Sequence, residues 1–144
     1  MKLLKLEDFP SHDDEKLRYS DMDMQGHVNN AVFTTLLETG RASLLAHPSI
    51  NAWDHKQYGY VIARLEVDYL AELRWPGKVH IGTGIKSIGK SSVVLAQALF
   101  KGETCVATAQ SVMVQVGKAS HRPEPISEEA RAILEGLLLK TPSA

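Results

Sequence analysis

The sequence predicts one domain of the α+β class, in which an antiparallel sheet packs on a long helix. The chain has 144 residues, a usual length for one domain, and its 44% hydrophobic and 23% charged residues are typical of a globular protein. One long stretch shows the three- and four-residue spacing of an amphipathic helix. Four later stretches alternate as strands do. Because the helical and extended patterns are segregated along the chain, we expect antiparallel pairing.

The N-terminal part is predicted to be irregular apart from one short strand. Residues 1–13 mix charged and apolar side chains and are interpreted as a lead-in, and we expect a strand from Glu15 to Ser20. Residues 21–28 have the composition of a loop, and Gly26 within it permits a turn or the close approach of a ligand. No apolar run follows a basic start as in a signal peptide, so we expect a cytoplasmic protein.

A long helix is predicted from about Asn30. The side chain of Asn29 or Asn30 can cap its start by accepting an unpaired backbone N–H. We expect it to end at His47–Pro48, since proline disfavours a helical conformation in the residue before it. Its apolar stripe consists of Phe33, Leu36, Leu37, Gly40, Leu44 and Leu45.

Four strands are predicted after the helix, and several are longer than the usual five or six residues. They cover residues 60–70, 79–85, 92–100 and 104–116. In the first, Leu65, Val67 and Tyr69 share one side and charged residues the other, which indicates one solvated face. In the last, one face carries the small side chains Cys105, Ala107, Ala109 and Ser111. A face of this kind allows the central helix to pack closely.

A second helix is predicted at residues 127–139. Ser127 can cap it, and Glu128 and Glu129 suit the positive end of its dipole. Its apolar stripe consists of Ile126, Ala130, Ile133, Leu134, Leu137 and Leu138.

Residues 84–91 match the phosphate-binding loop pattern G-x-x-x-x-G-K-S. That loop requires a helix after it, whose N-terminus holds the phosphates. The residues that follow Lys90 and Ser91 are instead typical of a strand. We therefore predict the turn of a β-hairpin here.

Composition excludes several other classes of protein. The formal net charge is −1, so the chain lacks the basic surface of a nucleic-acid-binding protein. A single cysteine, Cys105, excludes an internal disulfide and a cysteine-based zinc site. The apolar runs are far shorter than the ~18 residues needed to span a bilayer.

The densest polar stretch runs from Tyr19 to Asn30, at the start of the central helix. Free N–H groups at a helix N-terminus can stabilise an oxyanion, and an upstream carboxylate can act as nucleophile or as base toward water. Asp21, Asp23 and Asn30 can equally be turn and cap residues. A calcium loop is disfavoured because its later ligands are missing. His27 lacks a second His or Cys at zinc-ligand spacing.

This stretch, an aromatic residue followed by D-x-D-x-x-G-H-V-N-N, resembles the motif of hotdog-fold acyl-CoA thioesterases of the 4-hydroxybenzoyl-CoA thioesterase type. Residues 61–69 resemble the second strand of that family, and residues 117–126 resemble the segment before its C-terminal helix. The helix continues with Glu38 and Arg41, as in many relatives. The similarity covers roughly residues 15–139.

The resemblance implies a five-stranded antiparallel sheet wrapped around the central helix, and a homodimer or homotetramer with sites between subunits. The second aspartate of the motif, Asp23, would be the catalytic carboxylate. The backbone N–H of Asn30 or of Ala31 would polarise the thioester carbonyl. The remaining motif residues that would contact the substrate are Gly26, His27, Val28 and Asn29.

The implied substrate is an acyl-CoA, and we expect no metal or organic cofactor, because coenzyme A is part of the substrate and of the product. Arg64, Lys90 and Ser91 are candidates for contacts with its nucleotide part, although solvated strand and turn residues are the simpler interpretation.

Two other functions stay open. A hydratase or dehydratase on enoyl- or hydroxyacyl-thioesters would use His27 with an acidic partner such as Asp23. A non-catalytic acyl-CoA-binding module is the second. The sequence leaves open the acyl group, coenzyme A against acyl-carrier protein, dimer against tetramer, and nucleophile against general base.

Overall fold

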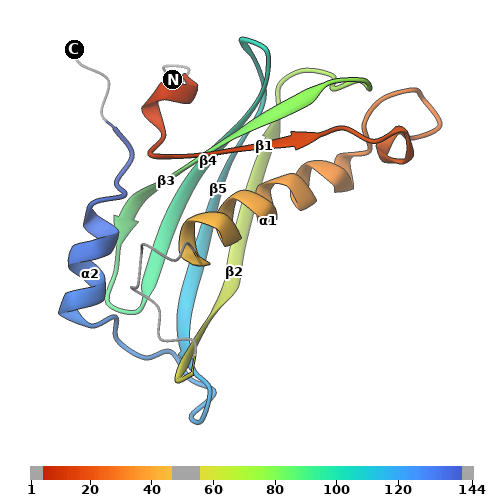
Figure 1. Cartoon of the computed structure of the whole chain (residues 1–144). Helices are drawn as coiled ribbons and strands as arrows, with labels where there is room; N and C mark the ends of the chain where they lie inside the picture. The colour runs from red at the N-terminus through yellow and green to blue at the C-terminus, as the bar shows by residue number, and fades with distance from the viewer. Residues whose placement is uncertain (1–4, 47–55, 141–144) are drawn as a thin grey trace.

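A single antiparallel sheet of five strands, in the order β1-β3-β4-β5-β2, forms the body of the molecule. The computed structural model describes residues 5–46 and 56–140. Helix α1 crosses the concave side of the curved sheet, and α2 lies at one end of it (Figure 1). The elements are η1 (Leu6–Asp8), β1 (Ser11–Lys16), η2 (Tyr19–Asp21), α1 (Asn30–Ala46), β2 (Tyr58–Tyr69), β3 (Lys78–Ile88), β4 (Ser92–Lys101), β5 (Thr104–Gly117) and α2 (Glu128–Glu135). The α+β hotdog arrangement is therefore confirmed.

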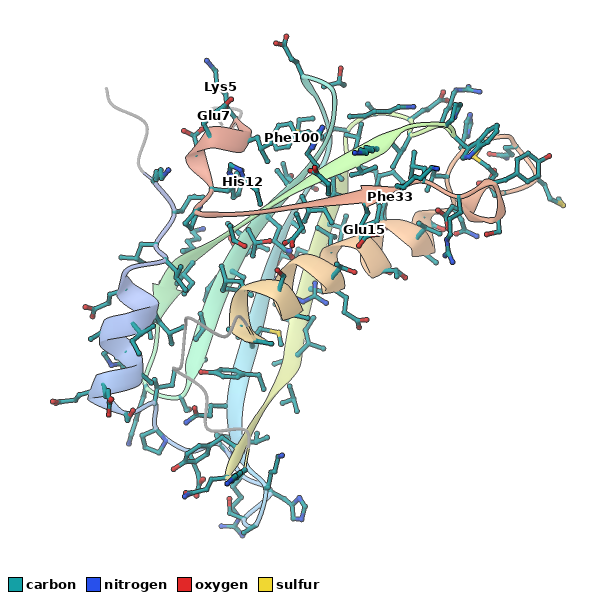
Figure 2. The ribbon with its side chains drawn as sticks, in the orientation of Figure 1. Lys5, Glu7, His12, Glu15, Phe33 and Phe100 are labelled. Atoms are coloured by element: carbon teal, nitrogen blue, oxygen red, sulfur yellow. The ribbon has the colours of Figure 1, made fainter. Side chains whose placement is uncertain are left out.

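Helix α1 buries the predicted stripe against the sheet. Phe33, Leu37 and Leu44 are almost completely shielded from solvent, and Phe33 is labelled in Figure 2. Gly40 brings the helix backbone close to β3 and β4. A Cβ atom at this position would lie 2.7 Å from the side chains of Gln97, Ile81 and Thr83. The predicted end of the helix at His47–Pro48 lies outside the described residues.

The prediction for the small face of β5 is correct for Ala107 and Ala109 but wrong for Cys105, which packs against the core cluster that contains Phe9, because the pairing of β4 with β5 shifts register next to it. Ala107 and Ala109 belong to the same core cluster as Phe33 and Leu37. A second cluster joins the C-terminal part of α1 to α2 and contains Leu44, Leu45, Ile85, Val93, Leu95, Met113, Ile126, Ala130 and Leu134. Both ends of α1 are thus fixed on the sheet.

The predictions for the N-terminal part were wrong in position. The first strand is Ser11–Lys16, so it begins inside the expected lead-in, and Tyr19–Asp21 forms a 3-10 turn. The sequence of this strand, SHDDEK, has no apolar residue to mark it. Its backbone pairing defines it instead, with Ser11 opposite Thr83 and Lys16 opposite Lys78.

The C-terminal helix is shorter than the predicted 127–139. Ser127 does cap it by accepting the N–H of Ala130, at 3.1 Å. The helix ends at Glu135, and Gly136 follows as its C-cap. The next leucines run beside β3, where Ile85 donates to the carbonyl of Leu137 at 2.9 Å and accepts from Leu139 at 2.7 Å. No helix in the described part of the chain is long and apolar enough to cross a membrane.

Residues 89–91 form the predicted hairpin turn. Gly89 donates its N–H to the carbonyl of Ser92, at 2.8 Å, and β4 begins directly afterwards. Strand β3 runs to Ile88, past the expected Ile85, with a register shift after Ile85. Strand β4, not a helix, follows Lys90 and Ser91, so residues 84–91 match the phosphate-binding loop in sequence but not in structure.

Candidate active site

The loop before α1 is closed by its own backbone. Asp23 donates its N–H to the carbonyl of His27 at 2.7 Å, and Gly26 donates to the carbonyl of Asp23 at 3.2 Å. Gly26 has φ +78°, a conformation that costs other residues strain. Val28 then donates to the carbonyl of Leu73, at 2.7 Å. This bond fixes the loop against the segment that follows β2.

The two aspartates of the motif have different surroundings. Asp21 is 5% exposed, and its carboxylate accepts the backbone N–H and the guanidinium of Arg18, at 2.8 and 3.0 Å. Asp23 is exposed, and its Oδ1 accepts the backbone N–H groups of Gln25 and His27, at 2.8 and 3.2 Å. Its Oδ2 has no hydrogen-bond partner among the described residues. Asp23 is thus an oriented carboxylate with one oxygen available.

The first turn of α1 retains one unpaired backbone donor. Oδ1 of Asn29 accepts the N–H of Ala31, and its carbonyl accepts that of Val32, both at 2.9 Å. The N–H of Asn30 has no partner within residues 5–46 and 56–140. Asn29 is therefore the cap. Of the two predicted oxyanion donors, Asn30 is free and Ala31 is occupied.

An open cleft of about 500 Å³ lies between this loop and the end of β2. Tyr69 forms part of its wall and stacks edge-on against Phe33, with ring centroids 5.2 Å apart. The Tyr69 hydroxyl donates to the carbonyl of Asn30, at 3.4 Å. The lining residues are Asp23, Gln25, His27, Val28, Asn30, Phe33, Tyr69, Leu70, Ala71, Glu72 and Leu73. The free carboxylate oxygen and the free N–H therefore belong to residues of the same cleft.

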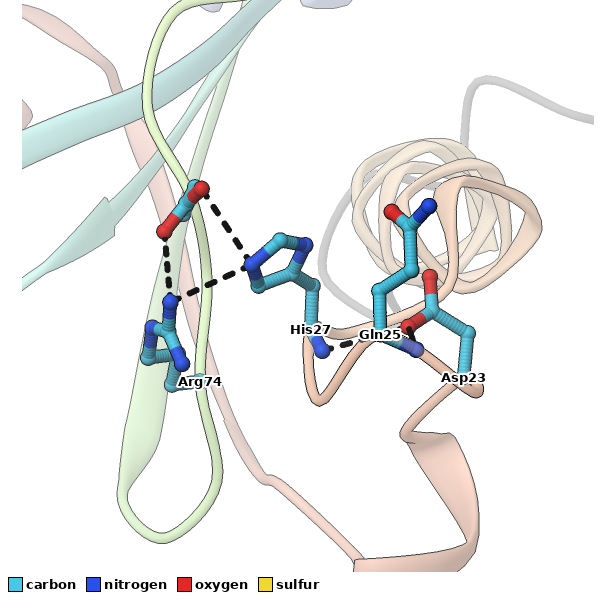
Figure 3. Close-up of polar contacts among 5 residues, drawn as sticks. Asp23, Gln25, His27 and Arg74 are labelled. Atoms are coloured by element: carbon cyan, nitrogen blue, oxygen red, sulfur yellow. Dashed lines mark hydrogen bonds and ion pairs between the residues drawn. The ribbon is translucent and has the colours of Figure 1, made fainter.

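His27 contacts two charged residues of the segment that follows β2, and one of them, Glu72, lines the cleft. Its Nε2 lies 3.2 Å from Oε1 of Glu72 and 3.2 Å from a guanidinium nitrogen of Arg74 (Figure 3). The same Arg74 nitrogen donates to Oε2 of Glu72, at 2.8 Å. The hydrogen bond from Arg74 and the nearby His27 lower the pKa of Glu72. Sequence reasoning missed Glu72 and Arg74, because no local pattern connects them with the motif.

The structure separates three predicted residues from this cleft. Arg64 forms an ion pair with Glu66 on β2, and neither residue lines the cleft. Lys90 and Ser91 follow the far end of β3, ~35 Å from the end nearest the loop along an extended strand. Within one protomer these residues do not face the motif. Their contact with the nucleotide part of a substrate stays a prediction.

The described residues contain no group of three or more His, Cys, Asp and Glu side chains that could hold a metal ion. The acid–base groups at the cleft are carboxylate, imidazole and phenol. The arrangement suits attack on a polarised carbonyl by an oriented carboxylate, or by water next to it.

The chain is similar to known proteins. Residues 17–134 match the family model described as the thioesterase-like superfamily. YsmA of Bacillus subtilis (strain 168) is 30% identical over 120 residues, which cover 82% of this chain and 80% of that protein. The acyl-CoA thioester hydrolase YbgC of Escherichia coli O157:H7 is 27% identical over 101 residues, 69% of this chain and 75% of YbgC.

A solved structure shows the same fold. It is a thioesterase from Thermus thermophilus in complex with coenzyme A and zinc. The TM-score is 0.80 and the identity 30%, with coverage of 91% of this chain and 96% of the other.

Proposed function

The chain belongs to the thioesterase-like superfamily, and from this premise we propose that it hydrolyses acyl-CoA thioesters to the free acid and coenzyme A. The observation that carries the proposal is the paired geometry of Asp23 and Asn30. One carboxylate oxygen is fixed by two backbone N–H groups while the other is free, and an unpaired N–H lies on the same cleft. The names of YbgC and of the coenzyme A complex support the substrate class.

In the proposed reaction the thioester carbonyl oxygen accepts the N–H of Asn30 at the start of α1. Charge that develops on this oxygen is stabilised by the N–H and by the positive end of the helix dipole. Where such donors have been removed in other enzymes, turnover falls by ~10²–10³. Phe33 and Leu73 supply an apolar wall for the acyl group.

Asp23 acts on the carbonyl carbon from its free oxygen. As a general base, it takes a proton from water while the water oxygen bonds to the carbonyl carbon. As a nucleophile, Oδ2 bonds to that carbon, and water later cleaves the resulting anhydride. In both routes the carbon–sulfur bond breaks, and its electron pair leaves with the sulfur of coenzyme A. The proposed reaction uses no metal or organic cofactor.

The proposal includes self-association as a homodimer or homotetramer. Strand β2 is an edge of the sheet, because it pairs only with β5 in the described part of the chain. Near the cleft its exposed side chains include Tyr69, and Leu70 follows it. An exposed edge with apolar residues is a surface on which a second chain can pack.

Replacing Asp23 tests the proposed function. We expect Asp23→Asn to lower kcat for thiol release by about 10²–10⁴, because a general base or nucleophile is lost. The melting temperature should change little, since the side chain is exposed. The measurement is thiol release from a chemically diverse set of acyl-CoAs, with crotonyl-CoA hydration assayed in parallel.

Asp14→Asn is the matched control, since Asp14 is an exposed aspartate of β1, at the opposite edge of the sheet from β2, and does not line the cleft. Full activity of Asp23→Asn would remove Asp23 from the mechanism. Hydration without thiol release would favour a hydratase, and binding without either reaction would favour a binding module. Label in the Asp23 carboxylate after a single turnover in ¹⁸O-labelled water would identify the nucleophilic route, because water reaches that carboxylate only by attack on the Asp23 carbon of the anhydride.

A further inference from the structure

Nε2 of His27 contacts one hydrogen-bond acceptor and one hydrogen-bond donor. An ionised carboxylate such as Glu72 only accepts hydrogen bonds, and a guanidinium such as Arg74 only donates them. Both lie 3.2 Å from Nε2. A ring nitrogen is either a donor or an acceptor, so it satisfies one of these two partners at a time.

The remaining hydrogen bonds decide between the two partners. The contacting nitrogen of Arg74 already has an acceptor, Oε2 of Glu72, at 2.8 Å. Oε1 of Glu72 has no donor other than His27 among the described residues. A hydrogen on Nε2 therefore gives both carboxylate oxygens of Glu72 a donor from the protein, whereas a lone pair on Nε2 leaves Oε1 to solvent. The bond from Nε2–H to a carboxylate is also charge-assisted.

The other ring nitrogen, Nδ1, is thereby left for the cleft. It has no hydrogen bond within the described part of the chain. Figure 3 shows it on the side of the ring turned away from Arg74 and toward Gln25 and Asp23. His27 lines the cleft together with these two residues.

We propose that Glu72 is a positioning residue that keeps the hydrogen on Nε2 of His27, so that Nδ1 faces the substrate. The inference rests on the proposed thioesterase function. In the imidazolium form Nδ1–H points toward the leaving group. As the carbon–sulfur bond breaks, its electron pair goes to sulfur, the proton passes from Nδ1 to that sulfur, and solvent reprotonates His27.

The charges around His27 come from both walls of the cleft. Asp23 lies on the same loop and accepts the His27 backbone N–H. Glu72 and Arg74 lie on the opposite segment, and Tyr69 on β2. Lys101 on β4 donates to the carbonyl of Arg74. The part of α1 that lines the cleft, Asn30 and Phe33, is uncharged. One carboxylate, of Glu72, and one guanidinium, of Arg74, therefore contact the His27 ring from the segment that follows β2.

NMR titration of the folded protein tests this assignment without any substrate. The His27 signals are identified by their loss in His27→Gln. We expect Glu72→Ala to move the neutral ring toward the Nδ1–H tautomer, because Nε2–H loses its acceptor while Arg74 still donates toward Nε2. Glu72→Gln, which keeps an acceptor, should preserve the Nε2–H tautomer. Arg74→Gln should preserve it as well, since Glu72 remains in place.

Activity supplies a second readout. Glu72→Ala should lower kcat for thiol release, because the His27 ring loses the acceptor that holds its orientation, whereas Glu72→Gln, which keeps an acceptor, should retain most of it. Asp14→Asn is the matched control, because Asp14 pairs with His80 at 2.5 Å outside the cleft. Its kcat should match that of the parent protein.

An unchanged His27 tautomer in Glu72→Ala, or the same loss of kcat in Glu72→Gln as in Glu72→Ala, would overturn the assignment. Failure of the proposed function has a different appearance. The parent protein would then release no thiol from any acyl-CoA, while the NMR shifts would still report how Glu72 holds His27.

Discussion

Two aspartates that are only two residues apart, Asp21 and Asp23, have different roles. Asp21 is satisfied by Arg18 and buried, so it stabilises the turn that precedes the loop. Asp23 uses only one oxygen to accept from the backbone. From sequence both residues were equally good turn residues, and the contrast arises from which neighbours the fold supplies.

Substitutions of Asn29 separate the effect of helix capping on stability from the effect of the helix terminus on catalysis. We expect Asn29→Ala to destabilise the protein by about 1 kcal/mol, because Ala31 loses the acceptor of its N–H. Asn29→Asp keeps that acceptor and suits the helix dipole, so its stability should equal or exceed that of the parent. Its kcat should nevertheless fall, because a negative charge then lies beside the proposed oxyanion donor, the N–H of Asn30. Urea denaturation and thiol-release kinetics measure the two effects.

An Asn29→Asp variant with unchanged kcat would argue against an oxyanion at this helix terminus. The serine variant Asn29→Ser is the control, since it retains a neutral cap and should affect both properties weakly.

The sequence identified half of the candidate site for a physical reason. Asp23, His27 and Asn30 lie within one short stretch whose composition marks it as a loop before a helix. Tyr69 contacts Asn30 across 39 residues of sequence, and Arg74 contacts His27 across 47. Such pairs depend on how the end of β2 folds back, which no local pattern encodes.

At the scale of the elements, α1 packs so closely on β3 and β4 that Gly40 has no room for a side chain. We expect Gly40→Ala to destabilise the protein by about 1–3 kcal/mol, although alanine is the better helix former by about 1 kcal/mol. The added Cβ would lie 2.7 Å from Gln97, Ile81 and Thr83, which are themselves buried and held in place. Thermal and urea denaturation measure the loss.

Thr35→Ala is the control on the exposed face of the same helix. There the introduced alanine should leave stability unchanged or raise it. A Gly40→Ala protein as stable as the parent would show that the helix can shift away from β3 and β4.

Elements with an apolar period were predicted well, and elements without one were not. The stripe of α1 and the alternation in β2 and β5 led to correct positions because burial imposes those periods. Strand β1 was misplaced because backbone pairing, not burial, defines it. The C-terminal helix was predicted too long because Leu137 continues the helical period although its carbonyl bonds to Ile85.

At the scale of the whole molecule, β2 forms one edge of the sheet and carries exposed apolar side chains. Val61 and Ile62 are 47% and 46% exposed on this edge strand. Exposed apolar side chains on an unpaired edge favour association or aggregation unless a partner covers them. Together with the family resemblance, this supports a subunit interface along β2.

A charge on this edge tests the interface. We expect Ile62→Lys to fold normally, because the side chain is half exposed in the monomer, but to shift the protein toward monomer. Sedimentation equilibrium measures the mass, and thiol release measures whether activity falls with it. Ser87→Lys is the control, because it adds the same charge at an exposed position of β3, away from β2 in the sheet order. An unchanged mass for Ile62→Lys would place any interface elsewhere.

The two ends of the described chain meet on the convex side of the sheet, where Lys140 donates its N–H to the carbonyl of Asp8 at 2.9 Å. Phe9 and Leu139 there cover neighbouring glycines of β3, Gly82 and Gly84. Because these two ends are close together, the strand pairing does not depend on where along the chain the gene begins. A circularly permuted gene, with its start and stop moved to the exposed β4–β5 turn at Gly102, would encode the same set of strand neighbours.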